Sequence, residues 1–152
     1  MKKINFAIIG CGRVSEHHAK IIKKNKKSNL IAVCDKNFFK AKKIGEKFKC
    51  LYFNSYKKLI KIKNKIDVVS ILTESGNHYN HVIELSQYFK NLIVEKPAAL
   101  KSKHVLKMNN VCKKYKTNLY FVQQNRFNKP IKKLKEIVNK KRLGKIVLCS
   151  VK

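Results

Sequence analysis

Short, almost uninterrupted hydrophobic runs alternate along the chain with longer stretches that are rich in lysine. The runs contain many β-branched residues, which is typical of strands buried on both faces of a sheet. The predicted strands are Ile4–Ile9, Leu30–Cys34, Leu51–Phe53, Val68–Leu72, Leu92–Val94, Leu119–Val122 and Ile146–Val151.

The stretches between these runs carry hydrophobic residues at helical spacing, with lysines on the opposite face. Ser102 stands at the start of one of them, where a hydroxyl can cap a helix. The predicted helices are Val14–Lys26, Phe38–Phe48, Tyr56–Ile62, His78–Phe89, Ser102–Tyr115 and Ile131–Lys141.

Alternation of strands and helices predicts an α/β fold, a Rossmann-type doubly wound parallel sheet with helices on both faces. The length of 152 residues suits about one domain. Ligands of such sheets bind at the carboxyl ends of the strands, near the point where the strand order reverses. Functional residues are therefore expected just after the hydrophobic runs.

A glycine-rich turn follows the first predicted strand. Residues 10–15 read G-C-G-R-V-S, which fits the dinucleotide pattern G-x-G-x-x-[G/A] with Ser15 at the last position. The first glycine permits a tight turn, and the second lets a pyrophosphate approach the backbone. An ordinary strand-to-helix turn is the alternative. The predicted cofactor-binding residues here are Gly10, Cys11, Gly12, Arg13 and Val14.

Asp35 ends the second predicted strand, about 20 residues beyond the glycine turn. A carboxylate at this place binds the adenosine ribose hydroxyls of NAD and repels the 2′-phosphate of NADP. The sequence thus predicts NAD as cofactor, with NADP less favoured. The adjacent Lys36 weakens this preference, and Asp35 could instead only begin a turn.

Three further stretches follow later predicted strands: TESGNH at 73–78, EKP at 95–97 and QNRF at 124–127. Together with the glycine turn, they make the whole chain similar to the N-terminal part of the Gfo/Idh/MocA oxidoreductases. The resemblance implies NAD(P)-dependent oxidation of a secondary alcohol of a sugar, nucleotide sugar or cyclitol, which would be the small-molecule partner.

The resemblance also implies roles for the matching residues. Lys96 would be the catalytic residue beside the nicotinamide and the substrate hydroxyl, and Glu95 would hold the nicotinamide ribose. Thr73, Glu74 and His78 would line the dinucleotide, and Arg126 would reach towards the substrate side. Without the resemblance, Lys96 is one lysine among many, and a surface role would be the simpler interpretation.

Members of this family are about twice as long as this chain. The resemblance therefore implies a dinucleotide-binding domain at residues 1–122 and, at 123–152, the start of a C-terminal substrate or dimerisation domain that is mostly absent. The chain would then be a fragment, a split reading frame or a free-standing module. A non-catalytic NAD-binding or interaction module is the alternative function. Self-association is expected, because the predicted last strand has no partner.

The net charge of +29 raises a third hypothesis, nucleic-acid binding. The basic residues are spread almost evenly over both halves of the chain, and only Arg13, Arg126 and Arg142 are arginines. Base and phosphate recognition often uses the planar fork of arginine. A solvated lysine surface is therefore preferred, and nucleic acid is not expected as a partner.

Five cysteines without a C-x-x-C pair predict reduced thiols in a cytoplasmic protein. No hydrophobic run reaches the roughly 18 residues of a membrane span. The histidines lack metal-ligand spacing, so no metal is expected.

Overall fold

The computed structural model describes residues 2–150. The chain forms two compact units, Met1–Val122 and Gln123–Lys152. The first unit is an α/β layer structure. In the second, residues 123–150 form a short 3₁₀ turn, one helix and a segment without regular structure.

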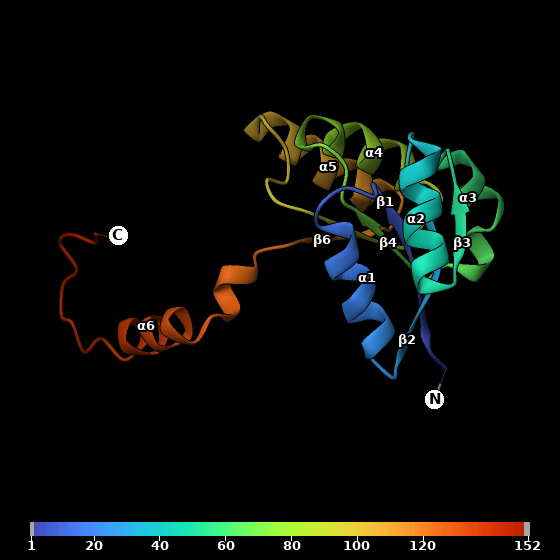
Figure 1. The fold of residues 1–152 in the computed structure, drawn as a ribbon. Helices are drawn as coiled ribbons and strands as arrows, with labels where there is room; N and C mark the ends of the chain where they lie inside the picture. The colour runs from blue at the N-terminus through green and yellow to red at the C-terminus, as the bar shows by residue number, and fades with distance from the viewer. Residues whose placement is uncertain (1, 151–152) are drawn as a thin grey trace. The chain divides into compact units, whose positions relative to one another are not determined.

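One six-stranded sheet runs through the first unit (Figure 1). Its strands pair in the order β3-β2-β1-β4-β5-β6, and every pairing is parallel. The order reverses between β1 and β4, which confirms the predicted doubly wound fold and places its switch point there. The strands are β1 (Ile4–Ile9), β2 (Ser28–Cys34), β3 (Leu51–Phe53), β4 (Val68–Ile71), β5 (Asn91–Val94) and β6 (Asn118–Phe121).

Helices cover both faces of this sheet (Figure 1). Within residues 2–150 there are also three short 3₁₀ segments, at Lys63–Lys65 and Ser75–Asn77 in the first unit and at Gln124–Phe127 in the second. The α-helices are α1 (Ser15–Lys24), α2 (Phe38–Phe48), α3 (Lys57–Lys61), α4 (His78–Leu85), α5 (Ser102–Lys114) and, in the second unit, α6 (Lys129–Asn139).

The alternation of side chains along β1 explains why both faces are hydrophobic. Ala7 and Ile9 belong to a buried core that also contains residues of α3, α4 and α5. Ile8, between them, belongs to a second core that contains residues of α1 and α2. Because Ala7, Ile8 and Ile9 are buried on both sides of the sheet, β1 ends in a hydrophobic run, although Asn5 interrupts its first half and Ile4 is exposed. The predicted bounds of this strand are confirmed.

Ser102 does not cap α5, so that prediction is wrong. Lys101 holds the N-cap position in an extended conformation, and no side chain caps the helix. Ser102 is the first helical residue, because the chain turns into the helix one residue earlier than its sequence indicates. β2 also begins earlier than predicted, at the polar Ser28, whose hydroxyl donates to the carbonyl of Ile22 over 2.7 Å.

The predicted strand at Ile146–Val151 is also wrong as far as the structure reaches. Residues 146–150 contain no strand, and Val151 lies outside the described residues. Val147 and Leu148 are exposed. A strand needs a neighbour for its backbone N–H and C=O groups, and within residues 2–150 no strand pairs with this segment. Hydrophobicity alone was therefore an insufficient signal.

Candidate functional site

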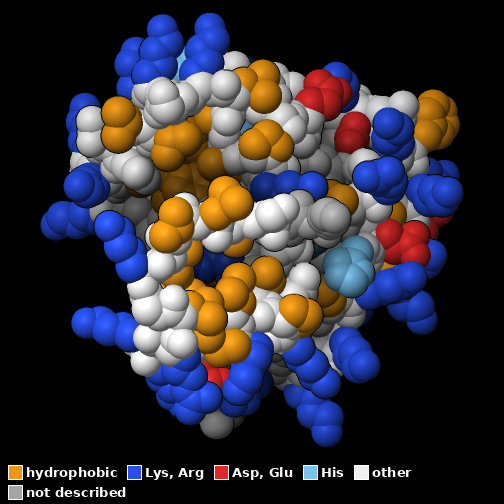
Figure 2. Space-filling model, turned by 90° about the vertical axis from the view of Figure 1, so that its left-hand side faces the viewer, with side chains coloured by type: hydrophobic (Ala, Val, Ile, Leu, Met, Phe, Trp, Pro, Cys, Tyr) orange, Lys and Arg blue, Asp and Glu red, His pale blue; other side chains and the backbone are white. Residues whose placement is uncertain are grey.

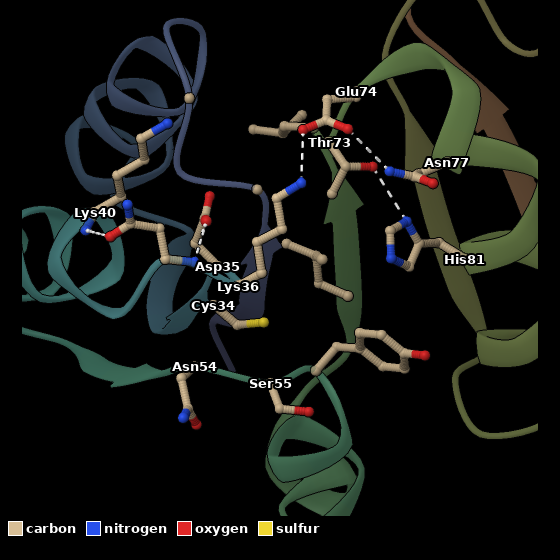
Figure 3. Close-up of a pocket in the computed structure, with 16 residues that line it drawn as sticks. Cys34, Asp35, Lys36, Lys40, Asn54, Ser55, Thr73, Glu74, Asn77 and His81 are labelled. Atoms are coloured by element: carbon tan, nitrogen blue, oxygen red, sulfur yellow. Dashed lines mark hydrogen bonds and ion pairs between the residues drawn. The ribbon is translucent and has the colours of Figure 1, made fainter.

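A cavity of about 530 Å³ lies at the carboxyl ends of the strands around the switch point. Residues from the loops after β1, β2, β3 and β4 line it (Figure 3). Five of the predicted cofactor residues are among them, namely Gly10, Gly12, Asp35, Thr73 and Glu74. The topology thus brings together residues that the sequence places in three separate stretches.

The two glycines of the turn have different environments. Gly10 has φ +95°, and a Cβ built on it would lie 2.7 Å from the backbone of Leu72 and Thr73. Only glycine fits where the ends of β1 and β4 approach this closely. A Cβ on Gly12 would instead have no protein atom within 4 Å. The protein itself leaves that space open, which is what close approach of a pyrophosphate to the backbone requires.

Asp35 is bound to the glycine turn. Its Oδ2 accepts a 2.7 Å hydrogen bond from the backbone N–H of Cys11, and its Oδ1 accepts a 2.8 Å bond from the N–H of Asn37. The carboxylate is therefore fixed beside the turn by two backbone donors. Such placement fits the ribose-binding role expected of an acid at the end of β2.

The other residues of the turn contribute through packing and backbone. Ser15 is fully buried, and its hydroxyl donates to the carbonyl of Gly12 over 2.6 Å. Burial, helped by the nearby Asp35 carboxylate, raises the pKa of the Cys11 thiol to about 12, so Cys11 is no nucleophile near neutral pH. Arg13 and Val14 are exposed at the start of α1.

The wall of the cavity near Thr73 contains a chain of polar contacts. Thr73 Oγ1 lies 3.1 Å from Nδ1 of His81, whose ring packs edge-on against Tyr56. Tyr56 donates a 2.6 Å hydrogen bond to Glu84, which raises the pKa of the phenol to about 12. Burial lowers the pKa of His81. Sequence analysis missed His81 and Tyr56, because neither belongs to a recognisable pattern.

His78 is buried between two loops. The family resemblance implies that it contacts the dinucleotide. In the structure its Nδ1 lies 2.8 Å from the carbonyl oxygen of Pro97, and its Nε2 lies 2.9 Å from that of Thr73. His78 therefore connects the loop after β4 to the loop after β5.

Glu95 and Lys96 follow β5, the next strand along the sheet. Oε1 of Glu95 lies 3.0 Å from Nε2 of His18 in α1, and its Oε2 accepts a 2.8 Å bond from the Lys96 N–H. The side chain of Lys96 is exposed, and the Lys96–Pro97 peptide bond is cis. His18, like His81 and Tyr56, was not connected to the site by its sequence pattern.

Arg126 belongs to the second unit, in the 3₁₀ turn Gln124–Phe127. Its backbone N–H donates to the carbonyl of Gln123 over 3.1 Å, and its side chain is exposed.

Basic residues far outnumber acidic ones in this chain, 37 against 8. Figure 2 shows many basic and few acidic side chains on the face in view. Within residues 2–150, no cluster of three His, Cys, Asp or Glu side chains could hold a metal ion. In the same part of the chain, none of the helices has the length and hydropathy that crossing a membrane would take.

The fold and the glycine turn agree with a known family. The chain belongs to the Gfo/Idh/MocA oxidoreductase family with an NAD-binding Rossmann fold, whose family model matches residues 4–124. The resemblance seen in the sequence is thereby confirmed, and so is the class of domain.

Individual relatives agree with this assignment. D-glucoside 3-dehydrogenase of Escherichia coli K12 is 26% identical over 150 residues, covering 98% of this chain and 43% of that protein. Myo-inositol 2-dehydrogenase of Thermotoga maritima is 29% identical over 145 residues, covering 93% and 42%. The chain thus spans less than half the length of these relatives.

Among solved structures, the WlbA dehydrogenase of Chromobacterium violaceum, in complex with NADH and UDP-GlcNAcA, is similar with a TM-score of 0.90. It is 32% identical, and the match covers 95% of this chain and 42% of that one. The WlbA dehydrogenase of Bordetella pertussis, also in complex with NADH and UDP-GlcNAcA, has the same TM-score at 27% identity.

Proposed function

We propose that this chain is the NAD(H)-binding part of an oxidoreductase that oxidises a secondary alcohol of a sugar, nucleotide sugar or cyclitol. The observation that carries the proposal is the 2.7 Å bond from Cys11 N–H to Asp35, beside the open side of Gly12. This bond joins the glycine turn and the acid after β2, the two parts of a dinucleotide site, at one cavity. The dehydrogenase relatives, which act on glucosides and myo-inositol, support the substrate class.

The residues around the cavity would divide the binding of the dinucleotide between them. The backbone at Gly12 and the first amides of α1 would receive the pyrophosphate. Asp35 would accept hydrogen bonds from the hydroxyl groups of the adenosine ribose. Its negative charge would repel the 2′-phosphate of NADP(H) and so disfavour that cofactor. Thr73 and Glu74 would border the dinucleotide on the side of β4.

The loop after β5 would serve the reaction itself. When bound, NAD⁺ supplies the hydride acceptor. Glu95, held by His18, would bind the nicotinamide ribose, and the exposed Lys96 would orient the substrate hydroxyl and, as the neutral amine, receive its proton at Nζ. Residues 123–152, with Arg126 on the substrate side, would belong to the substrate-binding domain. The five free cysteines support a reducing compartment, and we infer the cytoplasm.

Titration of the purified chain with NADH and NADPH, followed by cofactor fluorescence and calorimetry, tests the binding part of the proposal. We expect NADH to bind more tightly than NADPH. If neither NADH nor NADPH binds, the proposal is refuted. If both bind with equal affinity, the role of Asp35 is refuted.

The catalytic part requires a protein in which these residues are joined to the substrate domain. With panels of cyclitols, sugars and nucleotide sugars, formation of NADH should be observed by absorbance. Lys96→Ala should lower the rate by about 10²–10⁴-fold while NADH still binds. Lys101→Ala, another exposed lysine nearby, is the control. If NADH binds but no substrate is oxidised, the chain is a non-catalytic binding module.

A further inference from the structure

An ion pair spans the cavity between the loops after β2 and β4. Nζ of Lys36 lies 3.0 Å from Oε1 of Glu74, as the dashed line in Figure 3 marks. The other carboxylate oxygen of Glu74 accepts a 3.2 Å hydrogen bond from the side-chain amide of Asn77. All three residues line the cavity. Glu74 is therefore held in place by Asn77 while it binds Lys36.

Lys36 is the residue next to Asp35, at the place where a Rossmann site distinguishes NAD from NADP. An acid there binds the ribose hydroxyls, whereas a nearby basic side chain accommodates a 2′-phosphate. This chain has both side chains in succession, so the sequence alone gives conflicting signals. Which of the two side chains determines the cofactor preference depends on how freely each can turn towards the ribose.

The structure gives these two side chains unequal freedom. Asp35 cannot turn away from the site without losing its bonds to the Cys11 and Asn37 N–H groups. Lys36 has an exposed side chain, and its only ion pair among residues 2–150 is the one with Glu74. Lys36 can therefore change its position at small cost, and Glu74 determines where it rests.

We propose that Glu74 is a cofactor-specificity residue, which acts through its ion pair by holding Lys36 away from a 2′-phosphate. This inference rests on the proposed function, because it presumes that the cavity binds the adenosine end of the dinucleotide. A 2′-phosphate entering the site would face the fixed carboxylate of Asp35. Its natural counter-ion, Lys36, would already be paired.

The test measures dissociation constants of NADH and NADPH for four chains: the wild type, Glu74→Gln, Lys36→Gln and the double variant. Glu74→Gln keeps the size of the side chain but removes its charge and frees Lys36. We expect it to shift the NADH-to-NADPH affinity ratio towards NADPH by roughly three- to fivefold, the effect of one exposed charge pair. The shift should shrink in high salt, because the interacting groups are exposed.

Two controls separate this role from a general effect of charge. Glu46→Gln removes the same charge from an exposed pair with Lys42 in α2, so the ratio should stay that of the wild type. Lys40 also lines the cavity. If the freed Lys36 causes the gain in relative NADPH affinity, that gain should disappear when Lys36→Gln is added to Glu74→Gln. It should remain when Lys40→Gln is added instead.

An unchanged ratio in Glu74→Gln, in a chain with wild-type circular dichroism, would overturn the inference. A gain that survives Lys36→Gln would overturn it as well, because the effect would then not run through the ion pair. Binding of neither cofactor by the wild type is a separate result, which refutes the proposed function and the inference with it.

Discussion

The backbone N–H of Cys11 donates a 2.7 Å hydrogen bond to the carboxylate of Asp35. The glycine turn after β1 and the acid at the end of β2 are therefore one structural unit, although 24 residues separate the bonded groups in the chain. A change at Asp35 should affect both the preference for a cofactor and the order of the turn.

Asp35→Asn tests this coupling. The amide offers one oxygen in place of two, so one of the two backbone donors, Cys11 or Asn37, loses its acceptor. We expect NADH to bind about tenfold more weakly or worse, since a hydrogen bond to a charged group contributes about 1.5–3 kcal/mol. The preference for NADH over NADPH should also narrow, in Asp35→Ala as in Asp35→Asn.

Asp67→Asn is the matched control, because Asp67 accepts a 2.8 Å bond from the Asn5 N–H at the opposite end of the sheet. It should lower the free energy of unfolding without altering the ratio of the two affinities. Equal effects of both substitutions on that ratio would contradict a role for Asp35 in cofactor binding.

Substitutions of the two glycines of the turn should have different effects, one on stability and the other on cofactor binding. Gly10→Ala places a Cβ 2.7 Å from the backbone of Leu72 and Thr73 at φ +95°. We expect a loss of at least about 1–3 kcal/mol in the free energy of unfolding, measured with urea. Gly12→Val adds its side chain to open space, so stability should change little while NADH binding is abolished.

Undiminished NADH affinity in Gly12→Val would indicate that residues 10–15 form only a structural turn. A stable Gly10→Ala chain would contradict the close packing between the ends of β1 and β4.

His81 should make stability depend on pH in the weakly acidic range. Burial lowers its pKa below the ordinary value of 6.5, so the folded chain keeps the ring neutral where the unfolded chain takes up a proton. The unfolded state then binds more protons, and stability falls as the pH drops below about 6.5, down to the lower pKa of the folded state. Urea unfolding at pH 7.5 and 5.5 measures this difference.

His81→Gln should reduce that difference, because the amide stays neutral and can still meet the Thr73 hydroxyl. His17→Gln, at an exposed position, serves as control and should retain the wild-type difference. An equal reduction in both variants would contradict the assignment to His81.

The fold was predictable where strands are buried on both faces. β1 and α2 have the bounds that the hydrophobic pattern gives, because their inner residues, such as Ile8 in β1 and Ala41 and Ile44 in α2, are buried against the sheet. The bounds of β3 are also those predicted, although it is an edge strand with an exposed Leu51. The pattern failed at residues 146–150, where hydrophobic residues have no partner strand within the described chain. It also missed the start of β2 at Ser28, whose buried hydroxyl is satisfied by a carbonyl and so gives no hydrophobic signal.

The site was predictable only where its chemistry lies in short stretches of sequence. Gly10, Gly12 and Asp35 follow a known spacing and meet at one cavity. His18 and Glu95 are separated by 77 residues, and only the pairing of strands brings α1 next to the loop after β5. Local sequence contains no information on such a contact, since it arises from the order of strands in the sheet.

The pair formed by His18 and Glu95 gives a last prediction. Their side chains are mostly buried, and Nε2 of His18 lies 3.0 Å from Oε1 of Glu95. Without the histidine, Glu95 keeps only its bond to the Lys96 N–H and can turn away from the site. We expect His18→Ala to weaken NADH binding about fivefold, equivalent to about 1 kcal/mol. His18→Gln should restore most of this loss, because its amide can still donate to Glu95.

His17→Ala is the matched control for this prediction, because the neighbouring histidine on the same helix is exposed. Its NADH affinity, measured by the same fluorescence titration, should equal that of the wild type. A His18→Gln chain as weak as His18→Ala would show that packing of the ring, and not its hydrogen bond to Glu95, supports the site. Equal affinities of His18→Ala and the wild type would exclude any contribution of His18 to cofactor binding.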